Sequence, residues 1–234
     1  MTETVERVTI ARPRRADREG RLLDAFARLV VRYGYDKTSV EDIAREAGVS
    51  KGAVYLHWRS KEALFDATLA REAQRQLDDL RARVDADPDG GTLGAIYLHG
   101  MLAVADNPLI LALYTRDART LGDYVRRQTP GRNRQRMIFG QEFVRRMQAA
   151  DLMRADLDPE VTTYLMAVIS FGLLSVRQLG DAVTSPSLED TASALAGLIH
   201  RGFASGTHGS SDEGKQALRA LLDETSQLLA GSGS

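Results

Sequence analysis

Residues able to contact nucleic acid gather in one short part of the chain, between Thr38 and Lys61. Lysine, histidine and tyrosine side chains can donate hydrogen bonds to phosphates, and the small residues Gly52 and Ala53 would let a helix approach base edges closely. Ala53 could also contact a thymine methyl group. The candidate DNA-binding residues are Thr38, Ser39, Ser50, Lys51, Gly52, Ala53, Tyr55, His57 and Lys61.

Two short helices must position these side chains. The stretch "SVEDIAREAGVSKGAVYLHWRSKEALF", residues 39–65, holds two helical patterns separated by a Gly-Val-Ser turn and a third pattern further on. Two short helices joined by a tight turn containing glycine are typical of a helix-turn-helix, whose second helix lies in the major groove. The recognition helix is therefore predicted from Lys51 to about His57. Serines stand in the N-cap position before each helix: Ser39, in a capping box with Asp42, then Ser50 and Ser60.

Composition limits the class of protein. The 234 residues include no cysteine, which excludes disulfides, thiolate metal sites and a cysteine nucleophile and is compatible with the cytoplasm. The first 21 residues are polar and arginine-rich, without the apolar core of a signal peptide, so a cytoplasmic protein is expected. Residues 1–60 carry a net charge of +3 (12 Lys+Arg, 9 Asp+Glu) and the remainder −4 (19 against 23). This asymmetry permits DNA binding at the N-terminal end.

Apolar residues recur at helical spacing along the rest of the chain, and no convincing strand pattern occurs. A long amphipathic stretch from Leu64 to Val84 ends at "DADPDGG", residues 85–91. Further helices are predicted over residues 92–106, 108–116, 131–150, 158–180, 187–204 and 212–230, with Pro108 and Pro159 in first turns. We expect a flexible basic arm over residues 1–16, a DNA-binding domain over 17–65, a second domain over 66–230 and a disordered tail over 231–234.

The stretch "TSVEDIAREAGVSKGAVYLHWRSKEAL", together with the preceding helix and Tyr35, resembles the DNA-binding domain of the TetR family of bacterial transcription regulators. The resemblance covers roughly residues 17–69. The threonine usual at the third position of the family's recognition helix is Ala53 here, which bears on base preference. The resemblance implies an all-α protein: an N-terminal three-helix DNA-binding domain joined by a long helix to a C-terminal helical domain for ligand binding and dimerisation.

What the resemblance implies about function is a homodimeric repressor, released from a palindromic double-stranded DNA operator by a small-molecule effector. Effector binding would shift the long helix after Ser60 and change the separation of the two recognition helices. Family architecture would line the effector pocket with Tyr97, His99, Met101, Tyr114, Phe139, Phe143, Tyr164 and Phe171. Such aromatic and methionine side chains favour an apolar or aromatic ligand. Each of them can equally be an ordinary core residue.

The apolar stretch "VTTYLMAVISFGLLSV", residues 161–176, is shorter than the ~20 residues of a membrane span and is interpreted as a buried core helix. Apolar and small residues also form a stripe suited to a partner helix, with packing inside one chain as the alternative. The stripe comprises Leu165, Val168, Ile169, Gly172, Ser175, Val176 and Leu179.

Other functions remain open alternatives. One is a DNA-binding regulator or architectural protein without a small-molecule effector; another is an enzyme that uses the same fold. Neither a Gly-x-Ser-x-Gly motif nor a phosphate-binding loop occurs in the sequence, so no enzyme is expected. Histidines at 99, 200 and 208 are too scattered for a metal site by spacing, so we expect no metal and no cofactor.

Overall fold

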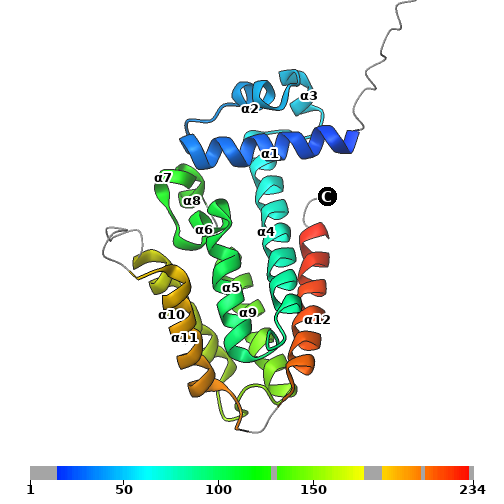
Figure 1. The fold of residues 1–234 in the computed structure, drawn as a ribbon. Coiled ribbons are helices and arrows are strands. Elements are labelled where there is room, and N and C mark those ends of the chain that lie inside the picture. The colour runs from blue at the N-terminus through cyan, green and yellow to red at the C-terminus, as the bar shows by residue number, and fades with distance from the viewer. Residues whose placement is uncertain (1–14, 128–130, 177–185, 207–208, 232–234) are drawn as a thin grey trace, which may run out of the picture.

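The computed structural model describes residues 15–127, 131–176, 186–206 and 209–231. All elements in this part of the chain are α-helices, which confirms the predicted all-α class. Three helices cross the upper end of the molecule, and a long fourth helix descends from them into a bundle (Figure 1). The predicted basic arm, apart from the two residues that begin α1, and the tail beyond Gly231 lie outside the described residues.

The first three helices begin and end where the sequence provides caps. Helix α1 spans Arg15–Tyr33 and ends at Gly34, whose φ of 90° is a left-handed conformation that favours glycine. Helix α2 (Val40–Ala47) starts at the predicted capping box and stops at Gly48, also left-handed. Helix α3 (Lys51–Tyr55) is capped by Ser50. It is two residues shorter than predicted.

Helix α4 spans Lys61–Ala86 and joins the upper helices to the bundle. It is capped by Ser60, as predicted, and ends within the predicted break at residues 85–91. It runs unbroken across the proposed domain boundary between residues 65 and 66. The DNA-binding and C-terminal parts therefore share one continuous helix.

The remaining long helices match the predicted ranges closely: α5 (Leu93–Ala105), α6 (Pro108–Thr115), α9 (Gly131–Ala149), α10 (Pro159–Val176), α11 (Leu188–Phe203) and α12 (Ser211–Gly231). Residues 177–180 of the predicted range 158–180 lie outside the described residues. Two short helices were not predicted: α7 (Ala118–Leu121) and α8 (Asp123–Arg127). Helices of four or five residues are too short to show an apolar period, so sequence pattern alone does not reveal them.

Two apolar cores hold the fold together. The lower core joins α4, α5 and α9–α12 around side chains such as Tyr97, Val144 and Leu222. The upper core packs Phe26, Ile43 and Phe65 from the N-terminal helices. Residues of α6–α8 also belong to the upper core: Leu109, Ala112, Leu121 and Tyr124. The DNA-binding part is therefore packed against three helices from the C-terminal part of the sequence.

Helix α10 differs from the prediction of a buried core helix. Only one face is buried, through residues such as Thr163, Ser170 and Leu173, while Val168 and Val176 are 53% and 63% exposed. By length and composition it is also apolar enough to cross a membrane, a test that core helices of soluble proteins pass too. Its exposed apolar face agrees with the stripe predicted for a partner helix, of which Leu179 lies outside the described residues.

Candidate nucleic-acid interface

The outer face of the helix-turn-helix is formed by α3 and the residue after it. Lys51 and Gly52 are exposed and Ala53 is half-buried. Tyr55 and Leu56 are 48% and 81% exposed. The helix is held from behind by Val54, which is 2% exposed and belongs to the upper core. This arrangement presents small, cationic, phenolic and aliphatic groups together on one convex surface, as insertion into a groove requires.

Serine hydroxyls at the helix starts serve mainly as caps. The Ser39 hydroxyl accepts from the Asp42 N–H (3.1 Å) and donates to the Asp42 carboxylate (2.6 Å). The Asp42 carboxylate also accepts from the Ser39 backbone N–H (3.1 Å), and the hydrogen bonds from the Ser39 hydroxyl and from this N–H lower the pKa of Asp42. The Ser50 hydroxyl accepts from the Ala53 N–H (3.3 Å), so its own proton can still be donated. Ser50 therefore remains a candidate for DNA contact through its side chain, whereas the Ser39 hydroxyl is engaged within the capping box.

Lys61 occupies a different environment from the one predicted. Its Nζ donates to the Tyr35 carbonyl (2.6 Å) and lies 4.0 Å from the centroid of the Tyr35 ring. Burial lowers the pKa of its ammonium group. The loop after α1 folds over the start of α4 and takes up this cation, so Lys61 ties the loop to α4 rather than standing free for a phosphate.

Thr38 and His57 also differ from the prediction that their side chains contact DNA. Thr38 is 2% exposed and donates to the Gly34 carbonyl (2.9 Å), which closes the turn after α1. The His57 side chain is 12% exposed, and its Nδ1 lies 4.0 Å from Glu19 Oε2 on α1. Thr38 is thus bonded to the turn after α1 and His57 lies close to α1, the helix that crosses beneath α2 and α3 (Figure 1).

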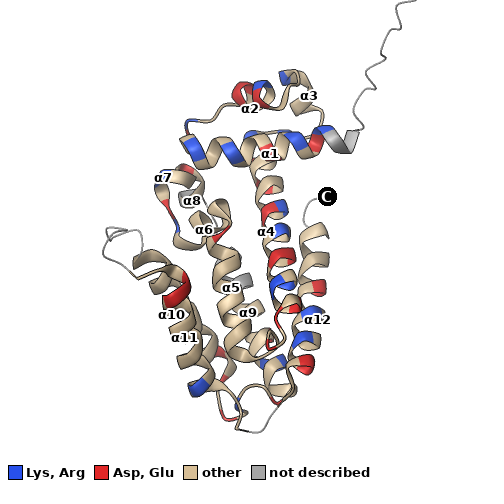
Figure 2. Cartoon of the chain, in the orientation of Figure 1, with Lys and Arg blue, Asp and Glu red and all other residues tan. Residues whose placement is uncertain are grey.

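Charge on the outer face is mixed. Helix α2 carries acidic side chains beside its basic ones, and Figure 2 shows both colours on it. Lys51 forms an ion pair with Glu41 across the two helices. Their hydrogen bond is the main cause that raises the pKa of Lys51 and lowers that of Glu41. Lys51 is thus held at the start of α3 by α2, and phosphate binding would compete with this pair.

Further exposed residues of the helix-turn-helix and its flanking loops extend the predicted set: Lys37, Arg45, Leu56 and Arg59. Sequence pattern offers little signal for them, since exposed basic residues on short helices are common. Leu56 differs from the other three because it is apolar. A leucine 81% exposed at the end of a recognition helix is available for apolar contact with thymine methyl groups.

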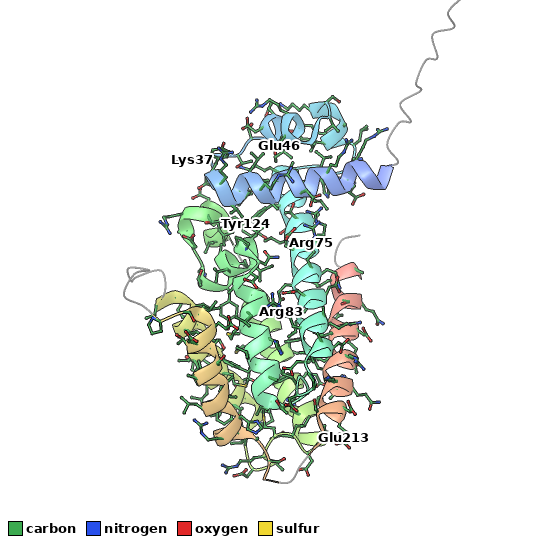
Figure 3. All side chains as sticks on the ribbon, viewed as in Figure 1. Lys37, Glu46, Arg75, Arg83, Tyr124 and Glu213 are labelled. Atoms are coloured by element: carbon green, nitrogen blue, oxygen red, sulfur yellow. The ribbon has the colours of Figure 1, made fainter. Side chains whose placement is uncertain are left out.

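A polar network connects the helix-turn-helix with the middle of α4. Glu72, whose side chain is 10% exposed, accepts from Arg75 (2.8 Å) and Arg71 (3.3 Å). Each of these arginines also reaches Asp24 of α1 at 2.9 Å. Arg75 lies on the side of α4 below α1 (Figure 3). Breaking these ion pairs would leave the buried Glu72 carboxylate unpaired, which is energetically costly. The network therefore fixes the position of α1 relative to α4.

The predicted effector-pocket residues separate into two groups. Tyr97 and Met101 are 5% and 8% exposed in the lower core, and Tyr114 and Phe143 pack against that core; Phe139 is half-buried on α9. The Tyr97 hydroxyl lies 3.0 Å from the Ser170 hydroxyl, and burial raises the pKa of Tyr97. Tyr97 of α5 and Ser170 of α10 therefore meet at a buried hydroxyl pair, and Tyr114 of α6 and Phe143 of α9 pack against the same lower core.

The other predicted pocket residues lie elsewhere. Tyr164 and Phe171 are 64% and 44% exposed on the outer face of α10, because their helical spacing places them beside Val168 rather than beside Ser170. His99 Nε2 lies 2.9 Å from Asp87 Oδ2 at the end of α4. A shallow cleft of about 560 Å³ between α9 and α12, lined by residues including Arg146, Ala150 and Glu213, contains none of the predicted residues.

Known proteins resemble the chain in its DNA-binding part and in its C-terminal part. The profile of the family described as "Bacterial regulatory proteins, tetR family" matches residues 22–68. The HTH-type transcriptional repressor Rv1474c of Mycobacterium tuberculosis is 30% identical over 169 residues, which cover 71% of this chain and 85% of the relative.

Solved structures share the fold. A TetR-family transcriptional regulator from Rhodococcus sp. superposes with a TM-score of 0.57 at 24% identity, covering 79% of this chain and 97% of that one. The fatty acid degradation regulator FadR of Bacillus halodurans gives a TM-score of 0.60 at 15% identity, covering 79% and 95%. With its helix-turn-helix, its long α4 and this similarity to a repressor over most of both sequences, the chain belongs to the TetR family and is a DNA-binding transcriptional regulator.

Proposed function

We propose that the protein is a homodimeric repressor that binds a palindromic operator and is released from it by a small molecule. The observation that carries the DNA-binding half is the exposed surface of α3, with Lys51, Gly52, Ala53, Tyr55 and Leu56 held over a rigid core. Palindromic binding follows from two-fold symmetry, since two recognition helices must reach half-sites at a fixed spacing. The 30% identical repressor of M. tuberculosis supports repression as the direction of control.

Dimerisation is supported by α10. Its outer face exposes Val161, Tyr164, Leu165, Val168 and Phe171 at helical spacing, and Glu160 in the first turn is the one charged residue of this helix. Leu198 of α11, 59% exposed, adds to the apolar surface of the last helices. An apolar stripe of this length on a soluble protein marks an interaction surface, and a second copy would cover it with its own stripe.

The effector site is proposed within the lower core, around Tyr97, Met101, Tyr114 and Phe143, with Phe139 at its edge. The polar anchors there are the hydroxyls of Tyr97 and Ser170, 3.0 Å apart, and neither group carries a charge at neutral pH. Thr163 Oγ1, on the same inner face of α10, is buried without a hydrogen-bond partner. Uncharged hydroxyls in an apolar wall favour an apolar ligand with an uncharged hydroxyl or carbonyl group.

The first experiment is a gel-shift titration of the purified protein against the DNA flanking its own gene, at fixed salt with excess nonspecific competitor. We expect a competitor-resistant complex whose footprint contains an inverted repeat. If every duplex, including those selected from a random pool, is bound weakly and without sequence preference, the repressor proposal fails.

The alternative is a DNA-binding regulator without a small-molecule effector. A compound that enters the lower core should raise the melting temperature and lower operator affinity, because it binds the folded protein and favours one conformation. Tyr97→Phe and Ser170→Ala should reduce both effects of an uncharged ligand. Operator binding that no compound in a broad panel of apolar and aromatic molecules changes would favour the alternative.

A further inference from the structure

We infer that the α7–α8 segment, residues 118–127, is a second link between the C-terminal bundle and the helix-turn-helix, with Tyr124 and Asp36 as its positioning residues. The inference deepens the proposed function and rests on it. Helix α4 is the covalent connection between the two parts. The α7–α8 segment contacts the helix-turn-helix at a different place, the loop that follows α1.

The backbones of the two segments are in direct contact. The Tyr35 N–H donates to the Thr120 carbonyl at 2.8 Å. Beside it, a Cβ atom added to Gly34 would lie 2.8 Å from the Arg119 carbonyl, so the approach leaves no room for a side chain. Since the Gly34 backbone is left-handed as well, this position requires glycine for two independent reasons.

The Asp36 side chain adds to this contact between the α1–α2 loop and the α7–α8 segment. Its carboxylate oxygens accept from the N–H of Asp123, the first residue of α8, at 3.2 and 3.1 Å. A Cβ atom added to Gly122 would lie 2.1 Å from Asp36 Oδ2. The carboxylate of the α1–α2 loop is therefore seated against the turn between α7 and α8.

Tyr124 closes the contact from the side of α4. Its ring is 7% exposed and meets the Phe65 ring edge-on, with centroids 4.6 Å apart, and the Tyr35 ring at 5.6 Å. Its hydroxyl donates to Asp66 Oδ1 at 2.6 Å. Figure 3 shows this side chain beneath α1, between the α7–α8 segment and the upper end of α4.

These contacts have a mechanical consequence. Helix α6, which leads into α7, packs against α5 and α10 below and against α1 above. If an effector displaces α6, the loop holding Tyr35 and Asp36 must move with it or the contacts must break. Packed interfaces of this kind change between discrete arrangements rather than deform continuously. The orientation of the recognition helix is thus set by α4 and by the α7–α8 segment together.

The test measures orientation directly. The chain has no cysteine, so one introduced at the exposed Arg45 on α2 takes a single nitroxide label per protomer. Pulsed dipolar spectroscopy then gives the distance between the two labels of a dimer. In Tyr124→Phe combined with Asp36→Ala, we expect a distance distribution roughly twofold wider, because the docked orientation is less populated. Operator affinity, measured on the same variants with Arg45 retained and no label, should fall about 3- to 10-fold, as the competent fraction decreases.

Matched controls separate positioning from general damage. Tyr33→Phe removes a hydroxyl from a tyrosine 49% exposed on α1, and Asp78→Ala removes an exposed carboxylate from α4. The control pair should leave distance width and operator affinity unchanged. If the test and control variants give the same distance distribution and the same affinity as the parent, the inference is wrong. If the parent itself shows no label-to-label distance, the proposed dimer fails instead, which is a distinguishable result.

Discussion

The side-chain amide of Asn107 bridges the start of α6 and the middle of α4 by donating to the carboxylate of Glu72 at 3.1 Å and to its carbonyl at 3.3 Å. The same side chain caps α6, since its Oδ1 accepts from the Ile110 N–H at 3.2 Å. Glu72 in turn binds the arginines that reach α1. One asparagine therefore ties the first turn of α6 to the network that holds the helix-turn-helix.

Replacing Asn107 should separate its two roles. Asn107→Ala loses both the cap and the bridge, and we expect it to lower the free energy of unfolding by about 2 kcal/mol. Asn107→Ser can keep the cap but is too short to reach Glu72, so it should cost less stability while still weakening operator binding. Urea denaturation and operator titration measure the two effects. If the parent, Asn107→Ala and Asn107→Ser have equal stability and operator affinity, the bridge from Asn107 to Glu72 contributes to neither.

Tyr55 and Lys61 should respond differently to removal of their side chains. Tyr55→Ala removes an exposed, uncharged hydrogen-bond donor, so operator affinity should fall across all sequences while the slope of log K against log salt stays unchanged, because that slope counts the phosphates neutralised by cations. Lys61→Ala should instead lower stability, because its ammonium group is bound to the Tyr35 carbonyl. Titrations at several salt concentrations, paired with thermal melts, distinguish these outcomes. A flattened slope with unchanged stability in Lys61→Ala would return Lys61 to the phosphate-binding set.

The contrast between these two residues shows where sequence reasoning succeeds. Caps and helix ends were predictable because they depend on neighbours in sequence, such as Ser39 with Asp42 in the capping box or Pro108 in the first turn of α6. The burial of Thr38 and the capture of Lys61 depend on a loop folding over α4, which no local pattern encodes. Likewise, assigning Tyr164 and Phe171 to a pocket required knowing which face of an almost uniformly apolar helix packs inward.

The exposed face of α10 can be tested with one charge. Val168 is 53% exposed, so Val168→Asp should leave the fold of a single chain intact. In the proposed dimer the carboxylate would be buried without a partner, and dimerisation should weaken more than about tenfold. The matched control is Leu228→Asp on α12, where a leucine is 65% exposed away from the stripe. Sedimentation equilibrium measures the dimer dissociation constant of both variants. A Val168→Asp protein that dimerises as tightly as the parent would place the interface on another surface.

Base preference should depend on the two apolar residues of the recognition surface. Leu56 is 81% exposed, so Leu56→Ala costs the fold little, and any effect on operator choice reflects contact with DNA. If Leu56 contacts a thymine methyl group, its truncation should relax preference at that position by about 1 kcal/mol. Ala53→Thr adds a hydroxyl and a methyl group to the same surface and should change the preferred base rather than relax it.

Selection of binding sites from random duplexes tests both changes, with Leu228→Ala as a control that truncates another exposed leucine, on α12 outside the helix-turn-helix. We expect the control to return the parental consensus, Leu56→Ala a consensus degenerate at one or two positions per half-site, and Ala53→Thr a different base. The three variants share the parental phosphate contacts, so their salt dependence should be the same. If all of them return the parental consensus, base reading must come from residues outside α3 and Leu56, with the exposed Lys37, Arg45 and Arg59 next to be tested.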